Sequence, residues 1–309
     1  MIIAMVLAGC VDEVDVFQPI DLSSGDINRF FESVQSNPID VSWDASQEQT
    51  IQLPGSGRVI VPANSLLAQD GTPVSGMVQA KVLPLYNKSD YLLNRMATTS
   101  VEGALIRSNG AIDIRITQDG VPLRVKGNKP FTVQLATARY NANMRLFEGE
   151  ADEVNGVVNW IELNFADTPI NAIELTDDKS GEKVPGFEFE SKRLGRLLCG
   201  QYVENELGEG EVCLNVPQNF LGPSTIVFIT IDDYPSVAVM LPSNADNLPD
   251  YCRWNLPAGE SAKVIMIAEQ DSGKYFFAEQ TVPIMENLTI SIEPEEASLS
   301  DIMLALEGL

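Results

Sequence analysis

The stretch from Gly57 to Thr137 constrains the fold more than any other part of the chain, because short apolar runs alternate there with tight turns. The runs are rich in Val, Ile, Leu and Thr, and the turns carry the pairs Asp70-Gly71, Asn109-Gly110, Asp119-Gly120 and Gly127-Asn128. Ala111–Ile116 alternates most clearly, with three isoleucines on one face and with Asp113 and Arg115 on the other. Such runs, about 8–12 residues apart, are typical of antiparallel sandwiches and barrels. The sequence therefore predicts an all-β fold.

The length of 309 residues is enough for two ordinary domains. We expect two tandem β-sandwich domains of the Ig-like or Greek-key kind. The first spans residues 40–140, an acidic and glycine-containing linker spans 141–156, and a second β-rich domain spans 157–309. The irregular segment 84–93, which carries Tyr86 and Tyr91, is expected to be an exposed crossing loop.

Short helices are expected near the N-terminus and at the C-terminus. At 26–35, Ile27, Phe30, Phe31 and Val34 recur at helical spacing, and this apolar face is expected to pack on the first domain. Ser298 can cap a last helix, whose apolar stripe contains Leu299, Ile302, Met303 and Leu306. We expect this helix to cover the second domain.

Charge and the absence of histidine exclude several classes of function. The chain has 44 acidic and 20 basic residues, a formal net charge of −24, so nucleic-acid binding is not expected. There is no histidine, which excludes Ser-His-Asp and Cys-His catalysis and any histidine-ligated metal. Acid–base chemistry by paired carboxylates, or by a Lys or Tyr base, remains open.

The first ten residues, MIIAMVLAGC, fit the end of a bacterial lipoprotein signal peptide. An apolar run is followed by two small residues and by Cys10, which would be lipidated and become the new N-terminus. The segment 1–10 is shorter than a complete signal peptide and has no Lys or Arg, as a start codon placed too far downstream would explain. The alternative is an ordinary buried strand that ends in a free cysteine. Residues 11–39 are then expected to be an acidic tether followed by the short helix.

Residues 50–137 resemble an N-terminal domain of Bacteroidetes surface lipoproteins. The matching words are GRVIVP at 57–62, DGTPVSGMV at 70–78, TTS at 98–100, GAL at 103–105, GAIDIRI at 110–116 and DGVPL at 119–123. That domain is distantly similar to the β-sandwich of netrin receptors, ankyrins and zonula-occludens proteins. Asp12, Glu13 and Asp15, which follow Cys10, also resemble the surface-export signal of lipoproteins in this phylum. The resemblance implies a structural or adhesive module at the outer membrane, without catalysis.

Cys199 and Cys213 are a candidate disulfide, because they bracket a predicted hairpin whose turn is near Glu206. An exported chain is oxidised, which favours a disulfide. A pair that includes Cys252 and a chain with no disulfide remain the alternatives. Cysteines without histidine do not predict a zinc site.

Three acidic clusters and three tyrosines are weaker candidates. The clusters Asp177-Asp178, Asp232-Asp233 and Asp246/Asp250 lack the spacing of a calcium loop, so we expect solvated turns and no metal. Tyr86, Tyr91 and Tyr234 could form a platform for sugar stacking if all three were exposed.

These observations predict a lipid-anchored protein of the bacterial cell envelope with a binding, adhesive or assembly role, without catalysis and without a cofactor. Its partners would be the membrane, through the lipid, and another envelope protein or an extracellular glycan. Two alternatives remain: a carbohydrate-binding component of a glycan-uptake system, and a carboxylate-dependent glycoside hydrolase. The hydrolase would need two carboxylates about 5–10 Å apart in one pocket.

Overall fold

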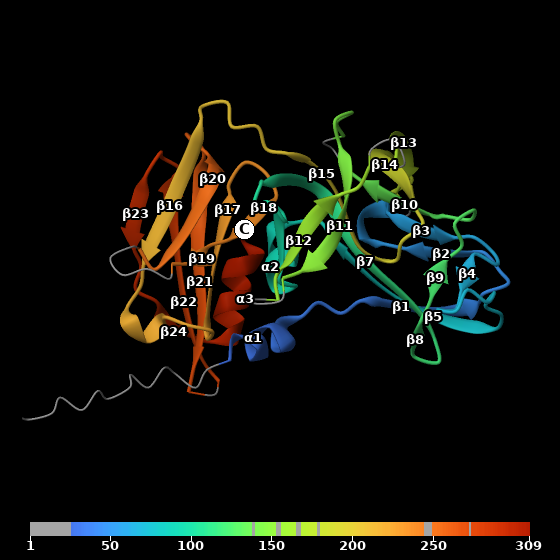
Figure 1. The fold of residues 1–309 in the computed structure, drawn as a ribbon, viewed down its shortest axis with the longest axis horizontal. Helices are drawn as coiled ribbons and strands as arrows, with labels where there is room; N and C mark the ends of the chain where they lie inside the picture. The colour runs from blue at the N-terminus through green and yellow to red at the C-terminus, as the bar shows by residue number, and fades with distance from the viewer. Residues whose placement is uncertain are drawn as a thin grey trace, which may run out of the picture.

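The computed structural model describes residues 26–137, 140–152, 156–164, 168–177, 180–243, 249–271 and 273–309. Strands make up most of the described chain, so the predicted all-β class is confirmed. The strands form two lobes that lie side by side, with helices at the junction between them (Figure 1). These helices are α1 (Ile27–Val34), α2 (Lys88–Leu93) and α3 (Leu299–Glu307).

The first lobe is a sandwich of two large sheets. One sheet has the order β1 (Ile39–Asp44), β5 (Met77–Leu85), β7 (Ile106–Gln118), β15 (Gly195–Tyr202), β11 (Arg145–Ala151), β12 (Val158–Glu162) and β6 (Met96–Ser100), and β8 (Val121–Pro122) pairs with β7. The facing sheet has the order β13 (Ile170–Thr176), β14 (Lys183–Ser191), β10 (Phe131–Ala136), β3 (Arg58–Val61) and β2 (Gln49–Gln52). Nearby are the 3-10 turn η1 (Pro54–Ser56) and the short pair β4 (Leu66–Leu67) and β9 (Arg124–Val125).

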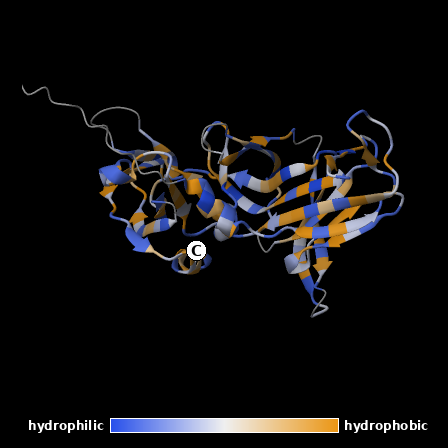
Figure 2. Cartoon of the chain, turned by 90° about the horizontal axis from the view of Figure 1, so that it is seen from below, coloured by the Kyte–Doolittle hydropathy of each residue, from blue (hydrophilic) through white to orange (hydrophobic). Residues whose placement is uncertain are grey.

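Apolar and polar residues alternate along the strands, so each sheet has one apolar face. The two sheets pack with these apolar faces toward each other. Val82 and Ile114 from one sheet and Val133 and Phe187 from the other are fully buried in one shared core. Apolar and polar residues alternate visibly along the strands of this lobe (Figure 2). We call this lobe the first sandwich.

The second sandwich pairs a four-stranded sheet with a five-stranded one. The first of these has the order β19 (Leu241–Pro242), β20 (Tyr251–Pro257), β16 (Glu209–Asn215) and β23 (Leu288–Ser291). The other has the order β18 (Ser236–Val239), β17 (Thr225–Ile231), β21 (Ser261–Gln270), β22 (Lys274–Pro283) and β24 (Glu295–Ala297). The 3-10 turn η3 (Gln218–Phe220) precedes β17.

Strand β17 is buried on both faces, which explains why its sequence, TIVFITI, is apolar at almost every position. Val227 and Ile229 point into the core of the second sandwich. Ile226 and Phe228 point the other way, into a third core that lies between the two sandwiches. We call this third cluster the junction core.

The junction core joins both sandwiches and the helices. Phe30 of α1 packs edge-to-face on Tyr275 at 5.7 Å between ring centroids, and Phe31 packs on Phe228 at 6.4 Å. Trp160 of the first sandwich is fully buried in the same cluster and donates its indole N–H to the carbonyl of Ala97 at 2.6 Å. The predicted helices at both ends of the chain are thus present, but they pack in this shared core rather than on one domain each.

The strand pairing corrects the predicted domain boundaries. The segment 141–156 is not a linker, because β11 lies within it and pairs with β15 on one side and β12 on the other. Strands β12 to β15, at 158–202, belong to the first sandwich, and the chain enters the second between Tyr202 and Glu209. The acidic residues of 141–156 suggested a linker, but Glu148 and Glu150 lie on a strand whose Leu146 and Phe147 are buried.

The expected exposed loop at 84–93 is also wrong. Asn87 caps α2 there, accepting a hydrogen bond from the backbone N–H of Asp90 at 2.9 Å. Tyr91 is fully buried, and its hydroxyl is hydrogen-bonded to that of Ser108 at 2.5 Å. Helix α2 therefore inserts its apolar face into the junction core.

Candidate functional site

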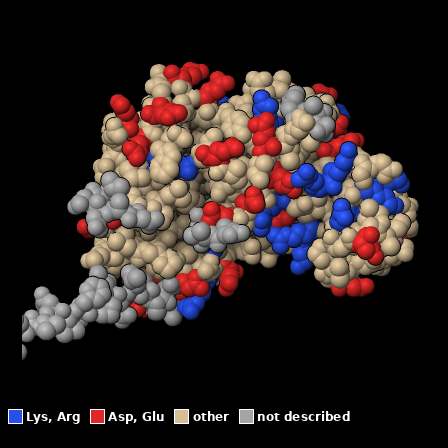
Figure 3. All heavy atoms as spheres, in the orientation of Figure 1, with Lys and Arg blue, Asp and Glu red and all other residues tan. Residues whose placement is uncertain are grey.

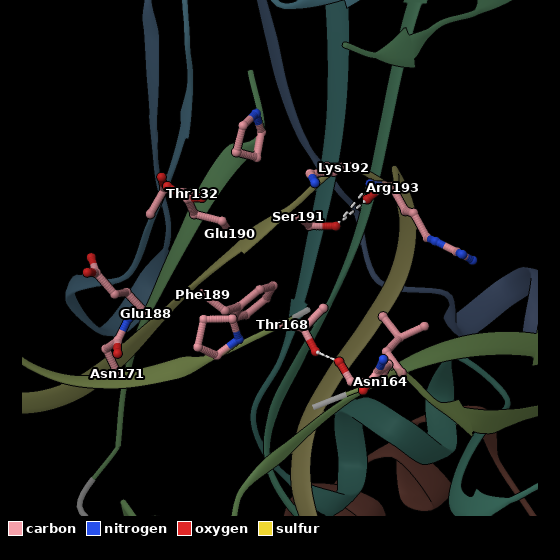
Figure 4. Close-up of a pocket in the computed structure, with 13 residues that line it drawn as sticks. Thr132, Asn164, Thr168, Asn171, Glu188, Phe189, Glu190, Ser191, Lys192 and Arg193 are labelled. Atoms are coloured by element: carbon pink, nitrogen blue, oxygen red, sulfur yellow. Dashed lines mark hydrogen bonds between the residues drawn. The ribbon is translucent and has the colours of Figure 1, made fainter. Parts of the chain in front are cut away.

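A cleft of about 640 Å³ lies at the edge of the first sandwich, beside β14. Strand β13 begins to pair with β14 only at Phe189, so among the described residues Glu190 and Ser191 have no partner strand on that side. The cleft is lined by β10, by β14 with the turn that follows it, and by the described residues on either side of 165–167 (Figure 4). The lining residues are Pro130, Thr132, Leu163, Asn164, Thr168, Pro169, Asn171, Glu188, Phe189, Glu190, Ser191, Lys192 and Arg193.

Local hydrogen bonds hold the walls of this cleft in place. The Ser191 hydroxyl donates to the carbonyl of Arg193 at 2.9 Å and accepts from its N–H at 3.0 Å, which fixes the turn. On the opposite wall, the Thr168 hydroxyl donates to the carbonyl of Asn164 at 2.9 Å. Both interactions are drawn in Figure 4. Arg193 also forms an ion pair with Glu148.

A row of hydrogen-bonded side chains runs across the outer face of the same sheet and ends at the cleft. Gln134 donates to Glu188 at 2.8 Å, and Arg58 donates through its Nε to Gln134. Asn171 is directly opposite Glu188 in the strand register, and the two side chains lie close together in Figure 4. This row orients the Glu188 carboxylate.

The cleft offers hydroxyl, amide and carboxylate groups from β10, β13 and β14 and from the described residues beside 165–167, whereas Phe189 is buried in the core. Such a set can hydrogen-bond a polar, hydroxyl-rich ligand. Glu188 and Glu190 are two positions apart on one strand and both line the cleft, so their Cα atoms are about 7 Å apart. Neither residue belongs to a motif that predicts a site from the sequence, although the alternating FEFE at 187–190 is typical of a strand with a charged outer face.

The cysteines pair differently from the prediction. Cys213 of β16 is bonded to Cys252 of β20, directly opposite it in the sheet, whereas Cys199 is a free thiol buried in the first sandwich. The predicted Cys199–Cys213 bond is wrong because β15 and β16 are not a hairpin: they belong to different sheets of different sandwiches. Burial raises the pKa of the Cys199 thiol well above its ordinary value. Glu211 lies beside the disulfide, but sulfurs bonded to each other are not thiolate ligands for a metal.

The three tyrosines do not form a stacking platform. Tyr91 and Tyr234 are buried, and the guanidinium of Arg107 lies over the Tyr234 ring at 4.3 Å. Tyr86 is partly buried and donates its hydroxyl to the carbonyl of Pro54 at 2.9 Å. Burial, with the nearby Glu260, raises the pKa of Tyr234 to about 12.

The acidic clusters are separate turns. The Asp177 carboxylate accepts from the hydroxyl of Ser56 at 2.8 Å and from the N–H of Ser180 at 2.7 Å. Asp232 and Asp233 lie in the β17–β18 turn, and Asp250 accepts from the N–H of Val216 at 2.7 Å. Asp178, Asp246 and the predicted lipidation residue Cys10 lie outside the described residues.

A second cavity, of about 720 Å³, opens between the ends of the second sandwich and α1. Apolar side chains dominate its wall, among them Leu221, Ile226, Val239 and Leu241. This cavity could accommodate apolar groups, whereas the cleft beside β14 is suited to polar ones.

Comparison with known protein families and with curated proteins finds no match for this chain. Among the helices that the structure describes, none combines the length and the hydropathy needed to cross a membrane.

Proposed function

We propose that this protein is a non-catalytic binding module of the bacterial cell envelope, anchored by lipid at Cys10, with the cleft beside β14 as its ligand site. The observation that carries the binding role is the cleft itself: polar side chains from two walls meet around about 640 Å³. The walls are regular strands and hydrogen-bonded turns, which hold these side chains in fixed positions. The resemblance of residues 50–137 to surface lipoproteins supports the envelope location.

The polar cleft favours an extracellular glycan as the ligand. Sugars bind through hydroxyl groups, which donate to carboxylates and accept from amides, and the cleft contains both. The one aromatic side chain in the lining, Phe189, is almost fully buried in the core of the first sandwich. Glycan binding here would therefore depend on hydrogen bonds, and not on a row of exposed aromatic rings.

Glycan-array screening of the purified protein, followed by titration of the best ligand, tests this proposal. Glu190→Gln replaces a charged acceptor by a neutral amide, and Asn171→Ala removes an amide, so each should weaken binding about tenfold. Glu295→Gln, on an exposed strand of the second sandwich, is the matched control and should leave binding unchanged. Equal loss in the control, or no ligand in the screen, would contradict the proposal.

The lipid anchor has its own test. Mass spectrometry of protein extracted from membranes should find the acylated residue Cys10 as the N-terminus. An unmodified N-terminus recovered in the soluble fraction would contradict the lipid anchor. It would not affect the proposal that the cleft beside β14 binds a ligand.

A glycoside hydrolase remains the second candidate because Glu188 and Glu190, two positions apart on β14, both line one cleft. Any hydrolysis of an array ligand should then be abolished by Glu190→Gln, while the weakened binding of the ligand is still measurable. Binding without turnover favours the non-catalytic role.

A further inference from the structure

Basic side chains are unevenly distributed in this acidic protein. Residues 203–309 contain three basic and 18 acidic residues, whereas residues 1–202 contain 17 of the 20 basic ones. On the face shown in Figure 3, basic side chains gather over the first sandwich and near the junction, and acidic ones dominate the second. In a protein with a net charge of −24, a cluster of basic side chains is unusual. Such a cluster indicates a site where an anion can bind.

Three of these cations meet on the outer face of the large sheet of the first sandwich. Lys81 of β5 is directly opposite Arg115 of β7 in the strand register, and Arg196 of β15 is directly opposite Asp113 of β7. Like charges directly opposite each other destabilise a sheet, because their Cβ atoms are about 5 Å apart. The sheet thus places two cations at an unfavourable spacing.

Asp113 compensates only part of this charge. Its buried carboxylate accepts two hydrogen bonds from Arg115, at 2.6 and 3.3 Å, and lies 3.7 Å from Arg196. The Nε of Arg196 is buried without a hydrogen-bond partner among the described residues. Within the same part of the chain, Lys81 has no ion pair or hydrogen bond. Asp40 of β1, directly opposite Lys81 in the register, supplies a second carboxylate. Three cations and two carboxylates leave a net local charge of about +1.

These side chains surround a hollow. It measures about 270 Å³ and is closed on one side by Gln35, Ser36 and Pro38, which connect α1 to β1. Asn94 also lines it and uses its amide N–H groups on Ser36 at 3.1 Å and on the Asp90 carbonyl at 2.8 Å. The buried Oδ1 of Asn94 has no partner among the described residues. The hollow therefore offers cationic donors, whereas the Oδ1 of Asn94 is too deeply buried for a ligand to reach.

We propose that this hollow is a second binding site, which takes the carboxylate of a small hydroxylated acid such as a sugar acid. The carboxylate lies between Lys81 and Arg196 and neutralises the excess charge, while Arg115 stays paired with Asp113. The hydroxyl groups of the ligand face the polar wall that Gln35 and Ser36 form. The volume is that of a single sugar ring rather than a chain. This site does not depend on the cleft beside β14.

The test is calorimetric titration with sodium glucuronate, with glucose as the uncharged comparator, at constant ionic strength. Wild type should bind glucuronate and not glucose. Lys81→Gln and Arg196→Gln should each weaken binding at least about tenfold, the effect of losing one charge-assisted hydrogen bond. Arg124→Gln is the matched control, because Arg124 is exposed on β9 and lies outside the hollow. It should leave binding unchanged.

Ligand-free stability separates a binding role from a structural one. If Lys81 serves a ligand, Lys81→Gln removes both the repulsion from Arg115 and the attraction to Asp40 on the opposite side, so the midpoint of urea unfolding should stay close to that of the wild type. Binding of glucose as strong as that of glucuronate, equal loss of binding in Arg124→Gln, or a clearly lower midpoint for Lys81→Gln would each overturn the proposal.

Discussion

Thr98 of β6 and Val237 of β18 join the two sandwiches through a single side chain. The Thr98 hydroxyl accepts a hydrogen bond from the N–H of Val237 at 2.8 Å and donates to the carbonyl of the same residue at 3.3 Å. Next to this contact, Ser236 donates its hydroxyl to the carbonyl of Ile106 at 2.7 Å. Strand β18 is at the edge of its sheet and does not pair with a strand of the first sandwich. These hydroxyl groups supply hydrogen-bond partners for backbone groups at this edge.

Replacing Thr98 by Val should lower the free energy of unfolding by about 1–3 kcal/mol. The change keeps the shape of the side chain but leaves the buried N–H of Val237 without an acceptor. Urea denaturation measures the effect. Because both sandwiches share the junction core, we expect one transition for the whole chain.

The control for this substitution is Thr50→Val on β2, an exposed strand position far from the junction. It should change the free energy by less than about 0.5 kcal/mol. Two separate transitions in the wild type would contradict the shared core.

The disulfide pairing gives a second prediction. Cys213 and Cys252 are 39 residues apart, and closing a loop of that length stabilises the folded chain by about 4 kcal/mol in the chain-entropy model. Cys213→Ala combined with Cys252→Ala should approach that loss. Cys199→Ala should cost about 1 kcal/mol or less, because its thiol is unpaired.

Non-reducing peptide mapping checks the pairing directly. It should recover the Cys213 and Cys252 peptides joined, and Cys199 should react with a thiol reagent only after unfolding, since the thiol is buried. A Cys199–Cys213 peptide would show that the pairing is different.

The strands of the first sandwich could be predicted from the sequence because their alternation is local. Ala111–Ile116 carries its pattern within six residues, and Asp119-Gly120 forms the expected turn, with φ of 51° and 81°. What the sequence did not reveal depends on contacts between distant segments. Strand β15 reads like the start of a hairpin with β16 and yet inserts between β7 and β11.

The candidate sites were missed for the same reason. Glu188 and Glu190 form a site only together with Asn164 and Thr132. These two residues are distant in the sequence and line the same cleft only in the folded sandwich. Lys81, Arg115 and Arg196 lie on three strands that become neighbours through pairing. Tyr91, in turn, could not be recognised as buried, because the junction core that covers it is formed by both lobes.

Stability should fall at alkaline pH as buried tyrosines ionise. Burial, with the nearby Asp250, raises the pKa of Tyr251 to about 12, whereas a tyrosine in the unfolded chain has a pKa of about 10. Between these values the unfolded chain has lost the proton and the folded chain has kept it, so the free energy of unfolding falls from pH 10 to pH 12. Buried Arg253, whose pKa burial lowers to about 10, acts in the opposite direction.

Urea denaturation at several pH values across this window measures the loss. Tyr251→Phe should flatten the fall by up to about 2 kcal/mol, because it removes one group that titrates differently in the two states. Tyr140→Phe, at an exposed position, is the control. An identical slope in Tyr251→Phe and wild type would exclude Tyr251 as a cause.

Besides its apolar contacts, α1 is attached to the second sandwich by an ion pair between Arg29 and the buried Glu269. Glu269 of β21 is fully buried, and its Oε1 accepts a hydrogen bond from Arg29 of α1 at 3.4 Å. The other carboxylate oxygen has no hydrogen-bond partner among the described residues. Arg29→Met should therefore lower the free energy of unfolding by about 1–3 kcal/mol, since it leaves a buried carboxylate without its cation.

A double variant, Arg29→Met with Glu269→Met, shows whether this loss of stability comes from the unpaired buried carboxylate or from lost packing. Replacing Glu269 by Met in the Arg29→Met background removes the charge, so stability should return to near the wild-type value or exceed it. Arg124→Met, on the exposed β9, controls for the loss of an arginine and should be nearly neutral. Glu269→Met alone completes the cycle. If the losses of the two single variants simply add in the double variant, the residues are not coupled, and the apolar residues of α1 hold it in the junction core without this ion pair.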